Sequence, residues 1–297
     1  MKKTPRQKGM AVIGALIVVA AASTATAVIM ERQTMLADTL AGERDRVQAK
    51  WLLRGGLDWA RVILFNDARN NAVTLRDAIW SQPIAGLEIT APDGQRRAYF
   101  SGLIEDEQSK YNLARLAVNG AVKASEVATL EILLASLDIT PQLAVAIAQH
   151  MARTQAGPGR AASAPGVRSL HDLIGIEHMT LDRIAALSEY LTILPQATPL
   201  NVNTASAEIL SAGIPGLDLA SARSLAEQRD QGMWFNSRGD FMNRLDNPQV
   251  AADVQLDVRS QWFKVTGEVR LDHASASLQA LLHRQASAPP AVRWIKD

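Results

Sequence analysis

Residues 10–30 read MAVIGALIVVAAASTATAVIM, and this uncharged run decides the architecture of the chain. As a helix, the 21 residues span about 32 Å, which is enough to cross the hydrocarbon core of a membrane. Four basic residues precede the run: Lys2, Lys3, Arg6 and Lys8. Because positive charge beside a span is retained in the cytoplasm, we expect the rest of the chain to lie on the other side of the membrane.

A cleaved secretory signal peptide is the alternative, since the small residues Ala25-Thr26-Ala27 follow the apolar core of the run. Two features favour an uncleaved helix. The Gly9-Met10 junction lies at the beginning of the apolar run, not after it. Beyond it, apolar residues continue at helical spacing, at Leu36, Leu40, Val47 and Trp51 and then at Leu53, Leu57, Ala60 and Leu64. A secreted scaffold with a cleaved signal stays open, and one long helix is the preferred prediction.

A basic leader that ends in glycine, followed by an apolar helix that continues as an amphipathic one, resembles the prepilins of type IV pili and type II secretion systems. The resemblance implies that a prepilin peptidase cleaves between Gly9 and Met10 and that Met10 becomes a methylated N-terminus. Most prepilins carry Glu at the fifth residue after the cleavage point, where this chain has Gly14. That absence is similar to the K-type minor pseudopilins of type II secretion.

The missing carboxylate has a physical reason. A carboxylate in lipid is costly unless it is paired, and in ordinary pilins its partner is understood to be the amino terminus of the subunit ahead. A subunit with nothing ahead of it has no use for Glu at Gly14. The resemblance therefore implies a position at the tip of the pseudopilus, where the protein initiates or caps assembly and aids export of folded proteins across the outer membrane.

The resemblance also implies location and partners. The precursor is expected in the inner membrane as a single-pass protein with its C-terminal domain in the periplasm. Its expected partners are two smaller minor pseudopilins, the major pseudopilin and the prepilin peptidase.

Composition excludes several other classes of function. Without the four basic leader residues, the chain has 27 Lys and Arg against 30 Asp and Glu, which gives no general attraction for nucleic acid. There is no cysteine, so no disulfide is expected. The sequence also has no Gly-x-Ser-x-Gly, phosphate-binding loop or His-Glu-x-x-His motif, and we do not expect an enzyme.

We predict an α+β fold in which a long, pilin-like N-terminal helix packs on an antiparallel sheet. Strand composition is found at 84–90, 96–104, 261–271, 274–283 and 292–295. Pro92-Asp93-Gly94 suits a tight turn between the first two strands, and no strand is expected from 112 to 247. The tryptophans, including Trp51, Trp59, Trp234 and Trp262, are expected in the core. The predicted parts are a leader (1–9), a transmembrane and assembly helix (10–30), a pilin-like domain (31–111 and 248–297) and an inserted all-α domain (112–247).

A short motif stands out in the helical interval. Residues 200–205 read LNVNTA, and two helical stretches separated by Pro215-Gly216 follow. Asn203 or Thr204 can cap the first of these helices, and Pro215-Gly216 suits the tight turn. The unit resembles a helix-hairpin-helix (SAM-like) motif, which K-type pseudopilins also contain after Asn-Val-Asn-Thr-Ala. Its candidate residues are Asn201, Asn203, Thr204, Pro215 and Gly216. A looser copy spans 133–151.

Helix-hairpin-helix units often bind DNA phosphates through a Gly-x-Gly turn, so a membrane-anchored DNA receptor is the rival function. Here Asp218 replaces the second glycine, and its carboxylate repels phosphate. We therefore expect a protein scaffold and no nucleic-acid partner.

An acidic stretch, Glu105-Asp106-Glu107, lies within 104–113, which resembles the corresponding stretch of K-type proteins. Three successive carboxylates can bind a hard cation or form a solvated turn, and the solvated turn is the preferred interpretation. K-type proteins can bind calcium, but where many of them carry aspartates this chain has His150-Met151-Ala152-Arg153. No metal ligand or cofactor is assigned.

Overall fold

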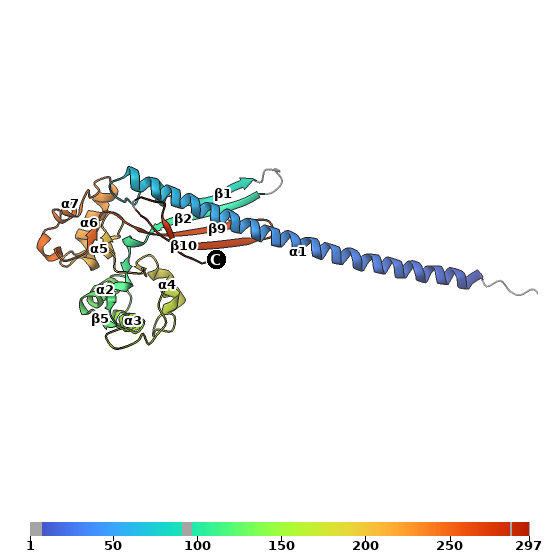
Figure 1. Ribbon diagram of the computed structural model, residues 1–297, viewed down its shortest axis with the longest axis horizontal. Coiled ribbons are helices and arrows are strands. Elements are labelled where there is room, and N and C mark those ends of the chain that lie inside the picture. The colour runs from blue at the N-terminus through green and yellow to red at the C-terminus, as the bar shows by residue number, and fades with distance from the viewer. Residues whose placement is uncertain (1–7, 91–96, 286, 297) are drawn as a thin grey trace, which may run out of the picture.

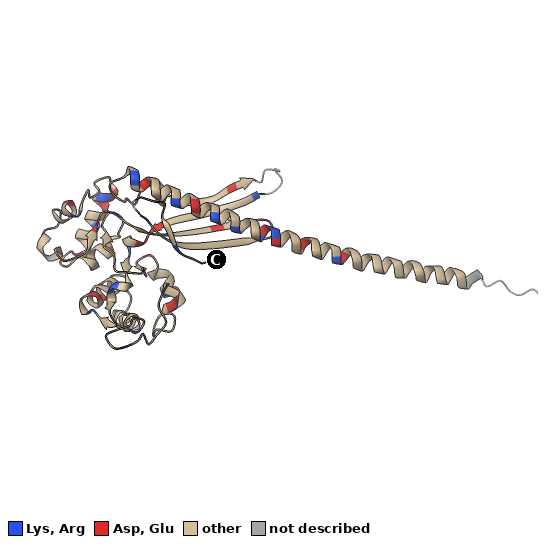
Figure 2. Cartoon of the chain, in the orientation of Figure 1, with Lys and Arg blue, Asp and Glu red and all other residues tan. Residues whose placement is uncertain are grey.

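The computed structural model describes residues 8–90, 97–285 and 287–296. A single helix, α1, runs from Lys8 to Asn70, and its first half projects away from the rest of the molecule (Figure 1). From Met10 to Met30 this half carries no charged side chain (Figure 2). α1 is the one described helix long and apolar enough to cross a membrane.

The second half of α1 lies along a five-stranded sheet. The strands are β1 (Ile84–Thr90), β2 (Arg97–Asp106), β9 (Trp262–Arg270), β10 (Ser275–His283) and β11 (Ala291–Lys296), in the order β1-β2-β9-β10-β11. Every neighbouring pair is antiparallel. The long helix and the antiparallel sheet agree with the predicted α+β class. The predicted turn at Pro92-Asp93-Gly94 lies outside the described residues.

The face of α1 predicted to be buried packs on the sheet. Leu53, Leu57, Ala60 and Leu64 are at most 5% exposed and share an apolar core with strand residues, among them Phe100, Val265, Val269 and Ala280. Burial of each large aliphatic side chain stabilises the fold by roughly 1.5–3 kcal/mol. The prediction for this face is confirmed.

The opposite side of α1 carries an exposed apolar stripe. We define the outer stripe as Leu36, Leu40, Val47, Trp51 and Val62, which are 51–65% exposed. At 3.6 residues per turn they fall within about 80° of arc, roughly opposite the buried face. The prediction that Trp51 and Trp59 lie in the core is therefore wrong, because the sheet covers only one side of the helix. Trp234 is also 39% exposed, whereas Trp262 is buried.

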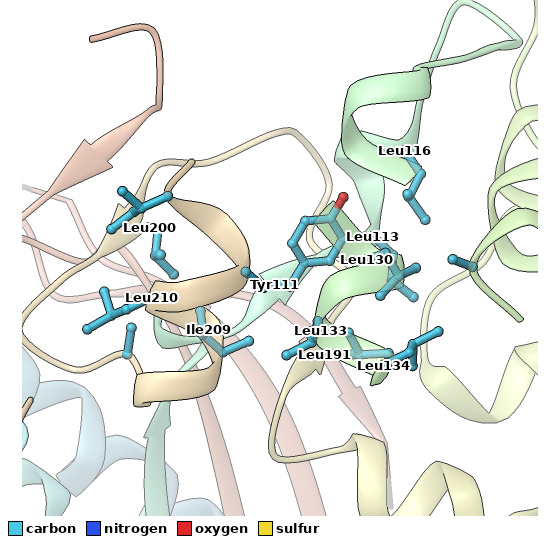
Figure 3. Packing of buried hydrophobic residues seen from close by; sticks show 14 of the residues in the cluster. Tyr111, Leu113, Leu116, Leu130, Leu133, Leu134, Leu191, Leu200, Ile209 and Leu210 are labelled. Carbon is cyan, nitrogen blue, oxygen red and sulfur yellow. The ribbon is translucent and has the colours of Figure 1, made fainter. Parts of the chain in front are cut away.

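Between β2 and β9, most of the regular secondary structure is helical. Its helices are α2 (Ala124–Ser136), α3 (Gln142–Arg153), α4 (Leu181–Leu187), α5 (Ala207–Gly213), α6 (Leu219–Asp230) and α7 (Arg238–Met242). Single 3-10 turns are η1 (Ile79–Ser81) before β1, and then η2 (Glu107–Ser109), η3 (Leu113–Leu116), η4 (Leu170–Leu173) and η5 (Pro248–Ala251). We call residues 107–261 the helical segment. One apolar cluster runs through it, with Tyr111 between the leucines of α2 and Ile209 and Leu210 of α5 (Figure 3).

Short strands also occur in this interval, contrary to the expectation that none lies between 112 and 247. β3 (Tyr111–Asn112) pairs in parallel with β6 (Leu191–Thr192), and β7 (Leu200–Asn201) with β8 (Leu256–Asp257). β4 (Ala117–Val118) and β5 (Ala121–Val122) form a hairpin. Its turn, Asn119-Gly120, has φ values of 53° and 75°, as a two-residue primed turn requires.

Candidate functional site

The residues predicted to be processed lie in the first turns of α1. The helix runs without interruption through Gly9 and Met10, and the Met10 side chain is 70% exposed. Gly14 has open space around it, with no other atom within 4 Å of a built Cβ. This end of α1 therefore offers an apolar, unpacked surface.

The candidate residues of the 200–205 motif gather around a buried carboxylate at the end of β2. Asp106 is 4% exposed, and its Oδ2 accepts hydrogen bonds from Thr204 Oγ1 (2.6 Å), Ser260 Oγ (2.6 Å) and Asn201 Nδ2 (3.2 Å). Its Oδ1 accepts from the backbone N–H of Gln108 at 2.8 Å. We call Asp106, Asn201, Thr204 and Ser260 the joint, because they connect the sheet with the helical segment.

Burial governs the charge state of Asp106. Removal from water raises the pKa of the carboxyl, while the four donors hold it down, and the net shift is upward. Arg284, which follows β10, lies beside this group: its guanidinium donates to the backbone oxygen of Ser260 and pairs with Asp67 at 2.8 Å.

Asn203 and Thr204 do not cap a helix, and that prediction is wrong. The cap of α5 is Ser206, whose Oγ accepts from the backbone N–H of Ile209. Asn203 instead exchanges two hydrogen bonds with the backbone of Phe235, at 2.8 and 2.9 Å. The Thr204 hydroxyl donates to Asp106. Their positions just before a helix suggested capping, but a buried partner distant in the sequence takes each side chain.

Pro215 and Gly216 lie in the turn between α5 and α6. Gly216 has a φ of +78°, a left-handed value that glycine adopts without steric cost. Asp218 caps α6, where one carboxylate oxygen accepts from the N–H groups of Ala220 and Ser221 at 2.8 and 2.9 Å. This residue therefore has a structural reason to be present at the turn.

The acidic stretch is not a solvated turn, and that preferred interpretation is wrong. Glu107 is 5% exposed. Lys110 Nζ contacts Glu107 at 2.9 Å and Glu105 at 3.1 Å, and Lys264 Nζ contacts Glu105 at 2.8 Å. Burial raises the pKa of Glu105, but the two ammonium groups outweigh it and hold the pKa below its ordinary value. The same carboxylates keep the pKa of Lys110 above its ordinary value, against desolvation.

A calcium ion does not fit these carboxylates, because two lysine ammonium groups already occupy the positions beside them. In the part of the chain that the structure describes, no group of three His, Asp or Glu residues is arranged to hold a metal. The third carboxylate, Asp106, faces hydroxyl and amide donors.

Sequence reasoning missed Ser260 and Arg284, which complete the surroundings of Asp106. They lie 154 and 178 positions after it in the chain, and no local pattern marks either one. Ser260 and Thr204 are 1% and 7% exposed, and both hydroxyls already donate to Asp106. The joint is therefore suited to hold parts of the protein together, not to chemistry.

Comparison with known proteins finds relatives of one kind. Residues 200–259 match the family model of type II secretion system (T2SS), protein K. Type II secretion system protein K of Pseudomonas aeruginosa is 26% identical, over 94% of this chain and 89% of that protein. The chain is similar to type II secretion system protein K over nearly its whole length. Protein K of Pectobacterium carotovorum subsp. carotovorum is likewise 26% identical, over 94% of this chain and 93% of its own length.

The fold is also similar to that of a solved protein. One chain from the crystal structure of the GspK-GspI-GspJ complex of enterotoxigenic Escherichia coli superposes with a TM-score of 0.65, over 86% of this chain and 97% of that one. At 19% identity this likeness concerns the fold alone. The family-model match and the two relatives support a minor pseudopilin of type II secretion, and the matched 200–259 region contains Asn201 and Thr204 of the joint.

Proposed function

We propose that this protein is the minor pseudopilin at the tip of the type II secretion pseudopilus, where it initiates or caps assembly and aids export of folded proteins. The observation that carries the proposal is Gly14, which leaves the exposed apolar half of α1 without a carboxylate. An ordinary pilin subunit needs that charge to pair with the subunit ahead. A tip subunit has none ahead, and an unpaired carboxylate in lipid is costly.

Processing follows the prepilin route in this proposal. A prepilin peptidase cleaves between Gly9 and Met10, Met10 is methylated, and the apolar half of α1 remains as a single-pass anchor in the inner membrane with the C-terminal part in the periplasm. The continuous helix from Lys8 to Asn70 supports this route. A signal peptidase substrate should instead be extended and small-residue-rich near Ala25-Thr26-Ala27, where α1 is helical.

The partners proposed are two smaller minor pseudopilins, bound through α1. The outer stripe supports this, because it offers exposed Leu, Val and Trp side chains on the side of the helix that the protein's own sheet leaves free. The related crystal structure is a complex of GspK with GspI and GspJ. The major pseudopilin is expected behind this tip complex, and no nucleic acid is expected to bind.

The helical segment serves as a scaffold in this proposal. The α5–α6 pair, with its turn at Pro215-Gly216, is a helix-hairpin-helix unit used for packing, and α2–α3 is a looser copy. Residues 112–247 form the inserted domain of a pilin-like protein, whose other domain is 31–111 with 248–297.

Intact-mass analysis of the membrane-extracted protein from a secreting strain tests the proposal. The expected mass is that of a chain beginning at Met10 and carrying one methyl group. The matched control is the same protein from a strain without the prepilin peptidase, in which the leader should be retained. A mature N-terminus near Val28 would refute the pilin route, since the apolar helix would then be absent from the final protein.

A further inference from the structure

A chain of buried polar contacts leads from the end of α1 to the helical segment. Asp67, near the end of α1, pairs with Arg284 at 2.8 Å. Arg284 donates to the backbone oxygen of Ser260, and the Ser260 hydroxyl donates to Asp106 at 2.6 Å. Asp106 in turn accepts from Thr204 of the helical segment, also at 2.6 Å. These five residues come from five parts of the chain that are distant in sequence.

Apolar packing connects the same two parts through one small cluster, in which Leu194 of the helical segment packs with Trp262 on β9 and Leu281 on β10. The core under α1 and the core of the helical segment are separate clusters of buried residues. A cleft of about 660 Å³ is lined by residues of both, among them Leu103 on the sheet and Ala226 on α6. Since hydrophobic contact is non-directional and the two large cores are separate, directional polar contacts are needed to define the angle between the two parts.

We propose that Asp106 is a positioning residue that couples α1 to the helical segment and sets the orientation of one relative to the other. Its carboxylate gathers three side-chain donors from two places in the helical segment, Asn201 and Thr204 together and Ser260 at the return to the sheet. Hydrogen bonds to an ionised acceptor are short, strong and directional. The helical segment therefore moves with α1 as one body, and wherever α1 is anchored, the segment has a defined position.

Spin-label distance measurements on the full-length, detergent-solubilised protein test this coupling. The sequence has no cysteine, so Lys50→Cys on α1 and Ala128→Cys on α2 give two unique exposed attachment sites. The parent protein should give one narrow distance distribution. Asp106→Asn replaces one acceptor oxygen by an amide NH₂ group, which then faces hydrogen-bond donors. Thr204→Val removes one donor to Asp106 at similar side-chain volume. Each variant should lose the single narrow peak.

Tyr111→Phe is the matched control. The Tyr111 hydroxyl is a buried donor that bonds to Glu126 within the helical segment and does not cross the joint. This variant should keep the narrow peak even where it lowers thermal stability. The proposal is overturned if the parent distribution is already broad, if Asp106→Asn and Thr204→Val both stay narrow, or if Tyr111→Phe broadens as much as they do. Thr204→Val decides the matter if Asp106→Asn does not fold.

Discussion

The ring of Phe100 occupies the space beside Gly56, so that a Cβ built on Gly56 would lie 2.6 Å from Cε2 and Cζ of Phe100. No real Cβ tolerates such a contact, and the ring packs between α1 and the sheet. Gly55, the neighbour, has nothing within 4 Å of a built Cβ. Of these two adjacent glycines, only Gly56 is required by packing, because a side chain fits at Gly55 and not at Gly56.

We expect Gly55→Ala and Gly56→Ala to change stability in opposite directions. Alanine is favoured over glycine in a helix interior by about 1 kcal/mol, so Gly55→Ala should stabilise the protein by up to that amount. Gly56→Ala gains the same helix preference, but its Cβ displaces the ring of Phe100. Because overpacking costs roughly 1–3 kcal/mol, Gly56→Ala should destabilise the protein. Urea unfolding of the detergent-solubilised protein measures both. Equal stabilisation by the two substitutions would show that the α1–sheet contact is looser than described.

The sequence predicted the periodic parts of the fold. The face with Leu53, Leu57 and Leu64 and the strands at 261–271 and 274–283 carry patterns with the period of a helix or a strand, and the structure has them within a few residues. The small hairpin at Asn119-Gly120 was predictable but missed, since Asn-Gly is a strong signal for a two-residue primed turn.

The joint was not predictable in the same way. The hydrogen bonds that join Asp106 to Thr204 and to Ser260 span 98 and 154 positions of the chain. Local sequence patterns indicate secondary structure but do not show which distant residues come into contact. An acidic run usually is solvated, so Glu105 to Glu107 suggested a surface turn. The deciding partners, Lys264 and Ser260, come from β9 and from the far end of the helical segment.

The acidic stretch should give two opposite pH dependences. The pKa of Glu105 lies below its ordinary value of 4.5 in the folded protein. The stability that Glu105 contributes is therefore fully present above that value and is lost as the pH falls through the folded pKa. The unfolding free energy of the parent minus that of Glu105→Gln should decrease toward acid.

Asp106 should behave in the reverse sense. The pKa of Asp106 in the folded protein is raised above the ordinary 3.8. The stability that protonated Asp106 contributes is therefore fully present below 3.8 and is lost as the pH rises through the folded pKa. The parent minus Asp106→Asn difference should thus fall as the pH rises from about 3.8. Unfolding curves between about pH 3 and 7 give both differences. Slopes of the same sign for the two variants would contradict these assignments.

Gly14→Glu tests the tip position. A carboxylate in the apolar helix costs roughly 2.5 kcal/mol or more without a partner. We expect secretion by a complemented strain to be reduced or unchanged, with Gly14→Gln as the uncharged control. A clear gain of assembly would mean that a subunit ahead supplies an amino terminus with which the introduced carboxylate pairs, and that the protein lies inside the fibre.

DNA binding is expected to be weak. The periplasmic part from Arg32 onward should bind duplex DNA no more tightly than the roughly 10⁻⁴ to 10⁻⁶ M of non-specific binding at physiological salt. Fluorescence anisotropy at several salt concentrations measures this. Asp218→Gly restores the glycine of a phosphate-binding turn but also removes the cap of α6, so Asp218→Ser, which retains a capping oxygen, is the control. Tight, salt-dependent binding by the parent that a change at Gly216 abolishes would support the DNA receptor.

The outer stripe should decide which part of the protein its companions bind. Leu40 and Trp51, both in the outer stripe of α1, are 61% and 65% exposed. Buried aromatic and aliphatic anchors dominate binding, and loss of a central one typically costs about 2 kcal/mol or more, about thirtyfold in affinity. A charge at either position is costly only if a partner covers it, so Leu40→Glu and Trp51→Glu should leave the fold intact and reduce co-purification of the two smaller minor pseudopilins.

Leu181→Glu is the matched control for that experiment, because Leu181 is 63% exposed and begins α4 in the helical segment. It introduces the same charge at a similar exposure, far from the stripe in the sequence. If α1 makes the contact, the complex survives Leu181→Glu and is lost with the stripe variants, whose circular dichroism and thermal unfolding should match the parent. If the stripe variants still co-purify and Leu181→Glu does not, the helical segment binds the companions, and the outer stripe must be covered by something else.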